Sequence, residues 1–302
     1  MFDTLGRLLY QLMMQFNDLV NNNPVLTATV FTIIIRLIMS PFDIISRKAM
    51  QKQMAAQPYL LRIQKRYESN PQVMQKKISE FNRKHGVSLW KGCLPMLLTW
   101  PIFIIFFDAM RYWANVETVK MFLEASNGVY DISHNAFLWV HNIWQPDSGL
   151  ASVIVPGANF AALPFDNLAR FFSAESMELV REAAANGGAV YTQVMAPVAQ
   201  QYEGVMNGWF ILPLLSAGLV VLQSFITQSK QMRQAQAGQR GGMSPWVMNI
   251  VIALITGYIC LSYNALFTVY WVVSNLCSII LQLILRAIYP MNSYKFEGEA
   301  EL

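Results

Sequence analysis

Five separate stretches of this sequence are apolar enough to cross a lipid bilayer as helices. They occupy residues 24–46, 93–113, 205–227, 245–263 and 264–288. A run of about 20 residues with few charges is typical of a membrane-spanning helix, because a helix satisfies its own backbone hydrogen bonds where no water can. Only 13% of the chain is charged, which is about half the share found in soluble domains. The pattern predicts an all-α integral membrane protein with a core of five transmembrane helices.

Lysine and arginine are distributed unevenly among the segments that flank these stretches. Residues 47–92 carry eleven Lys and Arg against two acids, residues 228–244 carry three against none, and residues 114–204 carry three against nine. Basic residues near the ends of spans mark the cytoplasmic side of a membrane. We therefore expect 47–92 and 228–244 to be cytoplasmic and 114–204 to be an extracytoplasmic loop. Five spans then place the N-terminus outside and the short tail, 289–302, in the cytoplasm.

The basic segment 47–92 has helical character. Asn70-Pro71 interrupts it, because a proline disfavours helix in the residue before it, and we expect an antiparallel hairpin of helices at 47–68 and 72–85. Its basic surface has two interpretations that the sequence leaves equally open: it marks topology alone, or it is a docking arm for acidic or RNA-bearing partners. The apolar residues expected to face one another in the hairpin are Leu60, Leu61, Ile63 and Tyr67 against Val73, Met74, Ile78 and Phe81.

Residues 1–23 do not read as a secretory signal, since they lack a basic leading region and a small-residue cleavage site. Apolar residues recur there with the helical period from Leu5 to Val20, while Arg7 and Asp18 lie elsewhere around the helix. The pattern predicts an amphipathic N-terminal helix. It fits equally well a helix that lies in the membrane interface and a helix that packs on the bundle.

The loop 114–204 is mixed in character, with one clear helical segment. The stretch AESMELVREAAANGG begins near Ser173 or Ala174 and is ended by Gly187-Gly188. No spacing typical of a catalytic site occurs in this loop, and none of the spans contains a histidine. The three cysteines are too widely spaced for a metal site, and the chain has no P-loop. The sequence therefore predicts a protein that is not an enzyme and that needs no metal or cofactor.

The stretch TIIIRLIMSP, residues 32–41, places Arg36 near the middle of the first span. That depth is on the order of 15 Å from either surface, and an arginine there costs roughly 3 kcal/mol on insertion scales. Polar residues at helical spacing share its face of the helix, and two other spans also carry polar residues. They are Thr29, Thr32, Ser40 and Asp43 on the first span, Trp271, Ser274 or Asn275, Ser278 and Gln282 on the last, and Gln223 on the third.

Polar stripes on three spans indicate a water-containing groove between helices, with Arg36 as its central charge. The competing interpretation is a buried structural arginine that donates hydrogen bonds to backbone carbonyls. For Thr32 and Gln223 alone, hydrogen bonds between packed helices are the simpler account.

Three motifs resemble the YidC family of membrane protein insertases, in the Oxa/Alb superfamily. They are TIIIRLIMSP, the run from AAQPYLLRIQKRY through NRKHGVSLWKGCLPMLLTWPIFIIFF, and VYWVVSNLCSII in the last span. The resemblance covers residues 24–113 and 205–288, and it implies a five-helix insertase core whose hydrophilic groove opens to cytoplasm and lipid. Its single groove arginine corresponds to Arg36. The predicted substrate-binding groove is then lined by Arg36, Thr32, Gln223, Tyr270, Trp271 and Asn275.

The resemblance also implies a function and its setting. Members of the family insert newly made proteins into the bacterial cell membrane and help them fold, alone or beside the Sec translocon. The expected partners are nascent membrane proteins, the ribosome, the Sec translocon and the lipid bilayer, with no small-molecule substrate and a monomeric chain. The alternative is a membrane transporter or channel with a midplane charge, although the sequence has no internal repeat of the transporter kind. The tail ends acidic, in KFEGEAEL, unlike the basic tails of many members.

Overall fold

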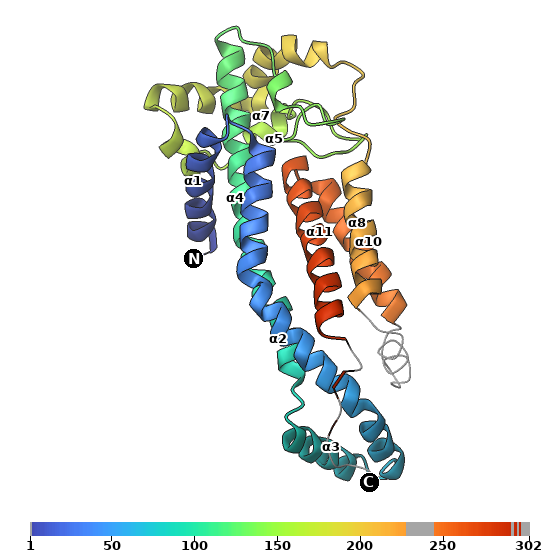
Figure 1. The fold of residues 1–302 in the computed structure, drawn as a ribbon. Coiled ribbons are helices and arrows are strands. Elements are labelled where there is room, and N and C mark those ends of the chain that lie inside the picture. The colour runs from blue at the N-terminus through green and yellow to red at the C-terminus, as the bar shows by residue number, and fades with distance from the viewer. Residues whose placement is uncertain (1, 228–244, 291–292, 295, 297–302) are drawn as a thin grey trace. The chain divides into compact units, whose positions relative to one another are not determined.

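The computed structural model describes residues 2–227, 245–290, 293, 294 and 296 (Figure 1). These residues form α-helices, two short 3-10 helices and loops, and within them the only β-structure is two isolated bridges. The all-α prediction is confirmed. The chain divides into two compact units: the first comprises residues 1–32, 103–219 and 253–273, and the second comprises residues 33–102, 220–252 and 274–302.

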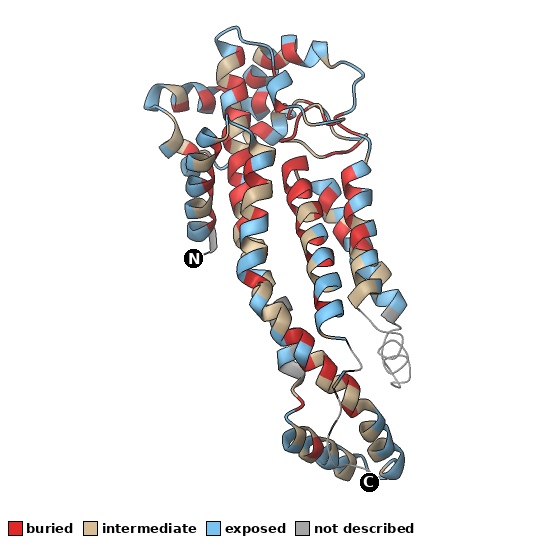
Figure 2. Ribbon diagram, in the orientation of Figure 1, coloured by how far each residue is buried: buried red, intermediate tan, exposed pale blue. Residues whose placement is uncertain are grey.

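Five long helices are predominantly apolar: α2 (Pro24–Arg66), α4 (Leu89–Ser126), α8 (Ile211–Thr227), α10 (Pro245–Ser262) and α11 (Ala265–Ile288). Within the described residues, α2, α4 and α11 are long and apolar enough to cross a membrane, whereas α8 and α10 are shorter, with 17 and 18 residues. Large apolar side chains on these helices remain exposed, among them Leu37 at 66% and Leu254 at 68%. Figure 2 shows exposed residues in pale blue along these helices. Extensive exposed apolar surface is typical of a protein that contacts lipid.

Helix α2 is longer than the predicted first span, because that span and the first hairpin helix form one continuous helix up to Arg66. Pro41 lies inside this helix and has no N–H to donate to the Leu37 carbonyl. The Ser40 hydroxyl donates to that carbonyl instead, at 2.8 Å. This hydrogen bond satisfies a backbone acceptor that lipid could not satisfy, so the helix can continue past the proline. Helix α4 likewise continues past residue 113 to its end at Ser126.

Helix α8 begins at Ile211, later than the predicted start of the third span at 205. The reason is a cap from a distant loop. The fully buried carboxylate of Asp147 accepts hydrogen bonds from the backbone N–H groups of Trp209, at 2.8 Å, and of Leu212, at 2.7 Å. The first N–H groups of a helix have no partner within the helix, and Asp147 supplies one from outside it.

The same loop also caps α11. The backbone N–H groups of Ala265 and Leu266 donate to the carbonyls of Gln145 and Ile143, at 2.9 and 3.1 Å. Asn264 adds a side-chain cap by accepting a hydrogen bond from the third residue of the helix, at 2.8 Å. One short loop therefore holds the N-termini of both α8 and α11 within the first unit.

Buried amides fix the position of this loop. Asn142 and Asn207 are both fully buried. The Asn207 amide donates to the carbonyls of Asn142 and Pro146, at 2.9 and 2.8 Å, and accepts from the Asn142 N–H at 2.8 Å. The next residue is Gly208, where a Cβ would lie 2.0 Å from Oδ1 of Asp147. A buried polar network whose members are hydrogen-bonded in this way favours one arrangement over its alternatives.

The N-terminal helix α1 (Phe2–Leu19) packs on the first unit through one face. Tyr10 is buried there. A Cβ at Gly6 would lie 2.6 Å from Cβ of Asp108, so α1 and α4 approach closely at this point. Packing on the bundle, one of the two alternatives, is therefore realised for this face. Leu12 on another face remains 57% exposed, and it stays available to a membrane surface.

The segment between α4 and α8 contains η1 (Ser133–Asn135), α5 (Gly157–Ala161), α6 (Phe165–Leu168), η2 (Ala169–Phe171) and α7 (Ala174–Gln201). Helix α7 begins where the sequence predicts, with the Ser173 hydroxyl accepting from the Ser176 N–H at 3.1 Å. Its backbone leaves helical geometry from Ala185 to Gly188, at the predicted stop, and a second helical stretch follows. Gly188 has a φ of 78°, and a Cβ there would lie 2.2 Å from the Gly157 carbonyl oxygen, so only glycine fits.

In the second unit, α3 (Pro71–His85) packs against the end of α2, and we call residues 47–87 the hairpin. The Asn70 side chain caps α3, and Gly86 ends it with a φ of 61°. The expectation that Leu61 faces the hairpin core is wrong, because Leu61 is 57% exposed. The hairpin core contains Ala56, Phe81 and Val87, with Tyr59, Leu60, Ile63 and Phe296 packed against it.

The predicted loop 228–244 and most of the tail lie outside the described residues.

Candidate functional site

Arg36 on α2 and Ser274 on α11 join the polar stripes of the first and last spans. Nε of Arg36 donates to Oγ of Ser274 at 2.9 Å, and Nη2 of Arg36 donates to the same oxygen. Both residues belong to the second unit. Ser274 is buried, whereas Arg36 remains partly exposed. The polar stripes of α2 and α11 therefore meet at the Arg36 guanidinium. This side chain is partly exposed at the protein surface.

The described contacts of Arg36 do not neutralise its charge. A guanidinium has five N–H donors, and the Ser274 hydroxyl engages donors on Nε and Nη2. Within the part of the chain that the structure describes, Arg36 forms no ion pair shorter than 4.0 Å. A neutral hydroxyl partner leaves the positive charge available to an anionic group, and a carboxylate can bind a guanidinium through two parallel hydrogen bonds.

Polar and apolar residues occupy different faces around this contact. On α11, Asn275 and Ser278 are 8% and 7% exposed, so the polar residues of the predicted stripe turn away from the surroundings. Leu276 and Ile280 on the same helix are 43% and 57% exposed. This polarity, with apolar residues outside and polar residues inside, is typical of membrane helices that enclose a polar site.

Thr32 lies one helical turn before Arg36 on α2 and is buried at 1% exposure. Its hydroxyl donates to the Ala28 carbonyl at 2.6 Å, so its donor is used within its own helix. This bond lies within α2, so it is not the hydrogen bond between packed helices that the sequence offered as the simpler account. Contact of Thr32 with a substrate stays a prediction.

Tyr270 and Trp271 belong to an aromatic cluster in the first unit. The Tyr270 ring stacks on Phe106 with 4.0 Å between ring centroids and an interplanar angle of 19°. The Trp271 ring contacts Phe103 edge-on at 5.1 Å and also contacts Phe267 at 5.8 Å. Such arrangements stabilise aromatic pairs beyond the area they bury, so both side chains have a packing role whatever else they contact.

The six predicted groove residues divide between the two units. Gln223 is half-buried on α8, and its backbone carbonyl accepts a hydrogen bond from the Thr227 hydroxyl at 2.7 Å. The structure brings Arg36 together with Ser274, which sequence analysis named only as an alternative to Asn275. Arg36, Gln223 and Asn275 lie in the second unit, and Thr32, Tyr270 and Trp271 lie in the first.

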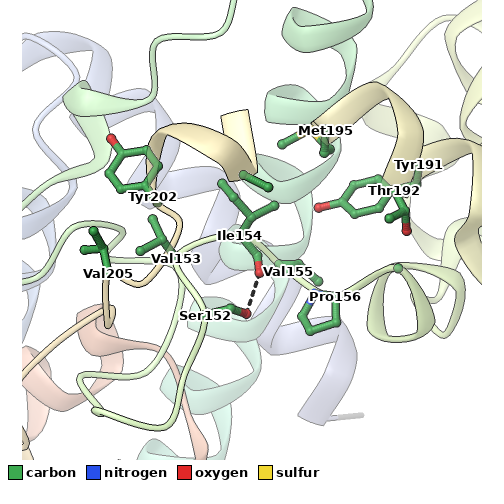
Figure 3. A pocket seen from close by; sticks show the side chains of 12 residues that line it. Ser152, Val153, Ile154, Val155, Pro156, Tyr191, Thr192, Met195, Tyr202 and Val205 are labelled. Carbon is green, nitrogen blue, oxygen red and sulfur yellow. Dashed lines mark hydrogen bonds between the residues drawn. The ribbon is translucent and has the colours of Figure 1, made fainter. Parts of the chain in front are cut away.

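A cavity of about 310 Å³ in the first unit was not predicted from the sequence (Figure 3). It lies between the loop 152–157 and residues of α7, including Tyr191 and Met195. Burial raises the pKa of the Tyr191 phenol above its ordinary value, so this group is a neutral hydroxyl at physiological pH. No carboxylate, imidazole or amine lines the cavity. Its residues gave no signal in the sequence because aliphatic and aromatic side chains line cavities and fill cores alike.

Candidate metal ligands are not clustered. Among the described residues, no three His, Cys, Asp or Glu side chains lie close enough to hold an ion. The buried carboxylate of Asp147 is instead occupied by donors, including Nε1 of Trp139 at 3.1 Å. Its arrangement is that of a structural cap.

Comparison with known proteins gives a consistent result. Residues 15–292 match the family model described as 60Kd inner membrane protein. The chain is 24% identical over 256 residues to the membrane protein insertase YidC of Clostridium perfringens, covering 85% of this chain and 75% of that protein. It is 24% identical over 266 residues to the protein of the same name from Campylobacter jejuni, covering 88% of this chain. A third YidC, from Clostridium tetani, is 32% identical over 120 residues, or 40% of this chain.

The lengths of these relatives differ from one another. The aligned part spans 75% of the Clostridium perfringens protein, 47% of the Clostridium tetani protein and 34% of the Campylobacter jejuni protein. The family match, by contrast, includes all six predicted groove residues and parts of both units.

Proposed function

This chain belongs to the 60Kd inner membrane protein family, and from that premise we propose that it inserts newly made membrane proteins into the bilayer and helps them fold. The relatives named as membrane protein insertases support this proposal. The observation that carries it is the contact of Arg36 with Ser274, which fixes a partly exposed cation among apolar helices. The proposed activity transfers a polypeptide from water into the lipid bilayer. No covalent bond of the substrate changes, and no cofactor is required.

In the proposed topology the protein spans the bacterial cell membrane five times, with its N-terminus outside and its C-terminus in the cytoplasm. The support is the excess of basic residues in 47–92 and 228–244 and the excess of acids in 114–204. Helices α8 and α10 are short for a span, and the bilayer can thin locally to match a short helix. In this topology the groove opens to the cytoplasm, and the loop that caps α8 and α11 lies outside.

The proposed mechanism begins with Arg36 holding the polar, often acidic, segment of the substrate that must cross first. Pairing with the guanidinium offsets part of the cost of removing a carboxylate from water. Ser274 orients the guanidinium through Nε and Nη2, which presents its remaining donors to the substrate. Gln223 and Asn275, which belong to the same unit as Arg36, would add neutral polar contacts to the substrate. Thr32, Tyr270 and Trp271 remain proposed substrate contacts in the first unit.

Two forces then move the substrate without a nucleotide. An inside-negative membrane potential drives each negative charge outward by about 2.3 kcal/mol per 100 mV. The apolar segment that follows leaves sideways into lipid, at a few tenths of a kcal/mol per residue. Over about twenty residues this partitioning yields several kcal/mol, which is enough to make insertion favourable once the polar segment has entered.

The proposed partners are the nascent chain, the ribosome that delivers it, the Sec translocon for larger substrates, and the lipid bilayer. The hairpin is the proposed contact for ribosomes, because eleven basic residues in 47–92 attract an RNA surface at long range. The chain acts as a monomer in this scheme.

The direct test uses the purified chain in proteoliposomes and a pair of single-spanning substrates that differ only in an acidic or neutral leading segment. Arg36→Ala is expected to lower insertion of the acidic substrate by about tenfold or more, because a bidentate charged contact is lost. Arg36→Lys should have an intermediate effect, since lysine keeps the charge but loses the planar fork. Protease protection of the inserted segment is the measurement.

A matched control is Arg111→Ala, because Arg111 is an exposed arginine that pairs with Asp108 at 3.3 Å. This control should insert both substrates normally. Equal insertion of the acidic substrate by Arg36→Ala and the unaltered chain would contradict the proposed role of the charge. A sustained flux of ions or solutes through vesicles without any substrate protein would favour the transporter or channel alternative.

A further inference from the structure

The residues that follow α11 return along the surface of α2. Nε of Arg47 donates to the Tyr289 carbonyl at 3.1 Å, and Nε2 of Gln51 donates to the Pro290 carbonyl at 2.7 Å and to Oγ of Ser293 at 2.9 Å. Arg47 and Gln51 are only 4% and 6% exposed, so these polar groups are covered rather than solvated. The beginning of the tail is therefore fastened to one face of α2 in the second unit.

Two lysines on the same face extend this contact. Nζ of Lys48 lies 5.1 Å from the ring centroid of Tyr289, and Nζ of Lys52 lies 5.5 Å from that of Tyr294. Both distances are within the range of a cation–π interaction. The lysines are four residues apart on α2, which places them on neighbouring turns of one helix face. The tail therefore presents aromatic rings to a basic surface.

Phe296 reaches the aromatic core of the hairpin. Its ring lies edge-on to Tyr59 at 6.1 Å, to Phe81 at 6.0 Å and to His85 at 4.9 Å. Tyr59 and Phe81 also stack on each other at 5.7 Å, with an interplanar angle of 24°. Side chains of α2 and α3 thus form an aromatic site in the hairpin, and Phe296 of the tail packs against this site.

The charges of the basic segment 47–92 and of the acidic tail are complementary. Residues 47–92 carry eleven basic residues against two acids, whereas the sequence after Phe296 continues with Glu297, Glu299 and Glu301, which lie outside the described residues. A basic surface with an aromatic site accepts an aromatic side chain and attracts carboxylates that follow it. The tail of this chain has both features in that order.

We infer that the hairpin carries a binding site for peptides in which aromatic residues are followed by acidic residues, and that the tail of this chain occupies the site. Tyr59, Phe81 and His85 receive the aromatic ring of Phe296, and Lys52 receives the ring of Tyr294 two residues before it. A partner protein with such a peptide must displace the tail before it binds. This inference stands on contacts within the second unit and does not depend on the insertase proposal.

The tether decides how strongly the tail competes. Phe296 follows the anchored residue Pro290 by six positions, and a segment on a short flexible linker has an effective concentration in the mM range. A free peptide at μM concentration is therefore excluded from the intact chain. Removal of the tail after Pro290 should open the site and leave the contact of Arg47 with Tyr289 in place.

The experiment measures binding of a fluorescent peptide, residues 291–302 of this chain, by anisotropy. The proteins are the full chain and the chain truncated after Pro290, both in lipid nanodiscs. The truncated chain is expected to bind at least about tenfold more tightly than the full chain, because no tethered tail competes. The same peptide with Phe296→Ala should bind about tenfold or more weakly to the truncated chain, because the partly buried ring and its aromatic contacts are lost. These changes lie in the peptide, so folding of the protein does not affect the comparison.

A control variant in the truncated chain is Leu61→Ala, which removes an exposed side chain of the hairpin outside the site and should leave peptide affinity unchanged. Equal affinity of the two peptides, or equal binding by the full and truncated chains, would overturn the inference. A photo-reactive benzoylphenylalanine at position 296 of the full chain gives a second readout. It should cross-link to the peptide fragment that contains Phe81 and His85, in a product of monomer mass. A product of dimer mass alone would show that the tail binds a second copy and would overturn the cis arrangement.

Discussion

At the residue scale, the hydrogen bonds of Arg36 to Ser274 offset roughly the cost of placing its charge in the membrane but do not neutralise that charge. An arginine at the centre of a membrane helix costs roughly 3 kcal/mol, and a hydrogen bond to a charged group contributes about 1.5–3 kcal/mol. The hydroxyl of Ser274 supplies such hydrogen bonds, but it supplies no negative charge. The balance is close to even, and an incoming carboxylate would improve it. That is the energetic reason to expect a substrate rather than a purely structural role.

Asp147 differs from Arg36 because its buried carboxylate accepts hydrogen bonds from several donors within the protein. Its carboxylate accepts hydrogen bonds from two backbone N–H groups at the start of α8 and from Trp139. Asp147→Ala would leave these buried donors without an acceptor, at a cost of about 3 kcal/mol. We expect the thermal midpoint of the purified chain to fall by about 5–10 °C, as measured by the loss of tryptophan fluorescence in detergent.

The control for this prediction is Asp166→Ala. Asp166 also forms a charged hydrogen bond, to Arg181 at 2.7 Å, but its side chain is 95% exposed. Exposed ion pairs contribute little to stability, so the midpoint should change by less than about 1 °C. A drop as large as that of Asp147→Ala would mean that burial of the cap is not what matters.

These two residues also show what the sequence could and could not predict. Arg36 was conspicuous because a charge inside an apolar run is expensive, and Ser274 lay on a polar stripe of the last span. Asp147 lies in the stretch PDSG, residues 146–149, whose composition is that of an ordinary turn. Its backbone partners are 62 and 65 residues away in the chain, and no local pattern reports a contact between segments so far apart. The position of the α8 N-terminus therefore had to come from the structure.

At the element scale, helix ends were predicted well where the signal is local. Ser173, Gly187-Gly188 and Asn70-Pro71 act on the backbone of their immediate neighbours, and the structure places the α7 start, the interruption of α7 and the α3 cap at these residues. The continuity of α2 past residue 46 was missed because the composition changes there from apolar to basic, and that change ends the apolar span without ending the helix.

The packing of the hairpin predicts that loss of the Phe81 ring destabilises α3 locally. Phe81 is 6% exposed at the centre of the hairpin core, and Phe81→Ala removes a ring at a cost of about 3 kcal/mol. Amide hydrogens of α3 should exchange about 100-fold faster, whereas those of the α4 segment in the first unit should be unchanged. Hydrogen exchange measured by mass spectrometry separates these segments.

Leu61→Ala is the matched control, since Leu61 belongs to the same stretch of α2 but is 57% exposed. Its effect on exchange in α3 should be small. If Leu61→Ala accelerated exchange in α3 as much as Phe81→Ala, the orientation of α2 in the hairpin would be wrong. If Phe81→Ala also destabilised the α4 segment, the hairpin would not be an independent packing element.

At the scale of the whole molecule, composition was enough to predict the class of protein and too little to predict its internal packing. Apolar runs with few charges admit only helices in lipid, which is why the all-α membrane class is confirmed. The assignment of groove residues to two units could not be predicted, because the boundary falls inside continuous helices such as α2 and α11. The aromatic contact of Phe296 with the hairpin was equally hidden, since it joins segments more than 200 residues apart.

We propose that the partly exposed guanidinium of Arg36 faces water that is continuous with the cytoplasm and that Ser274, its buried partner, lies at the edge of this water. A cysteine reacts with a charged thiol reagent only as a hydrated thiolate, so reactivity reports water at a chosen position. The variant is Ser274→Cys in a chain whose native Cys93, Cys260 and Cys277 have been replaced. The control is Ile38→Cys, because Ile38 is 65% exposed on the apolar face of α2.

The deciding measurement is the labelling rate of these two variants by a membrane-impermeant reagent, in inverted vesicles and in intact cells. We expect Ser274→Cys to react in inverted vesicles at least about 100-fold faster than Ile38→Cys and not to react from outside. Labelling of Ser274→Cys that is as slow as that of Ile38→Cys from both sides would contradict the account, because the arginine would then be sealed in a dry contact.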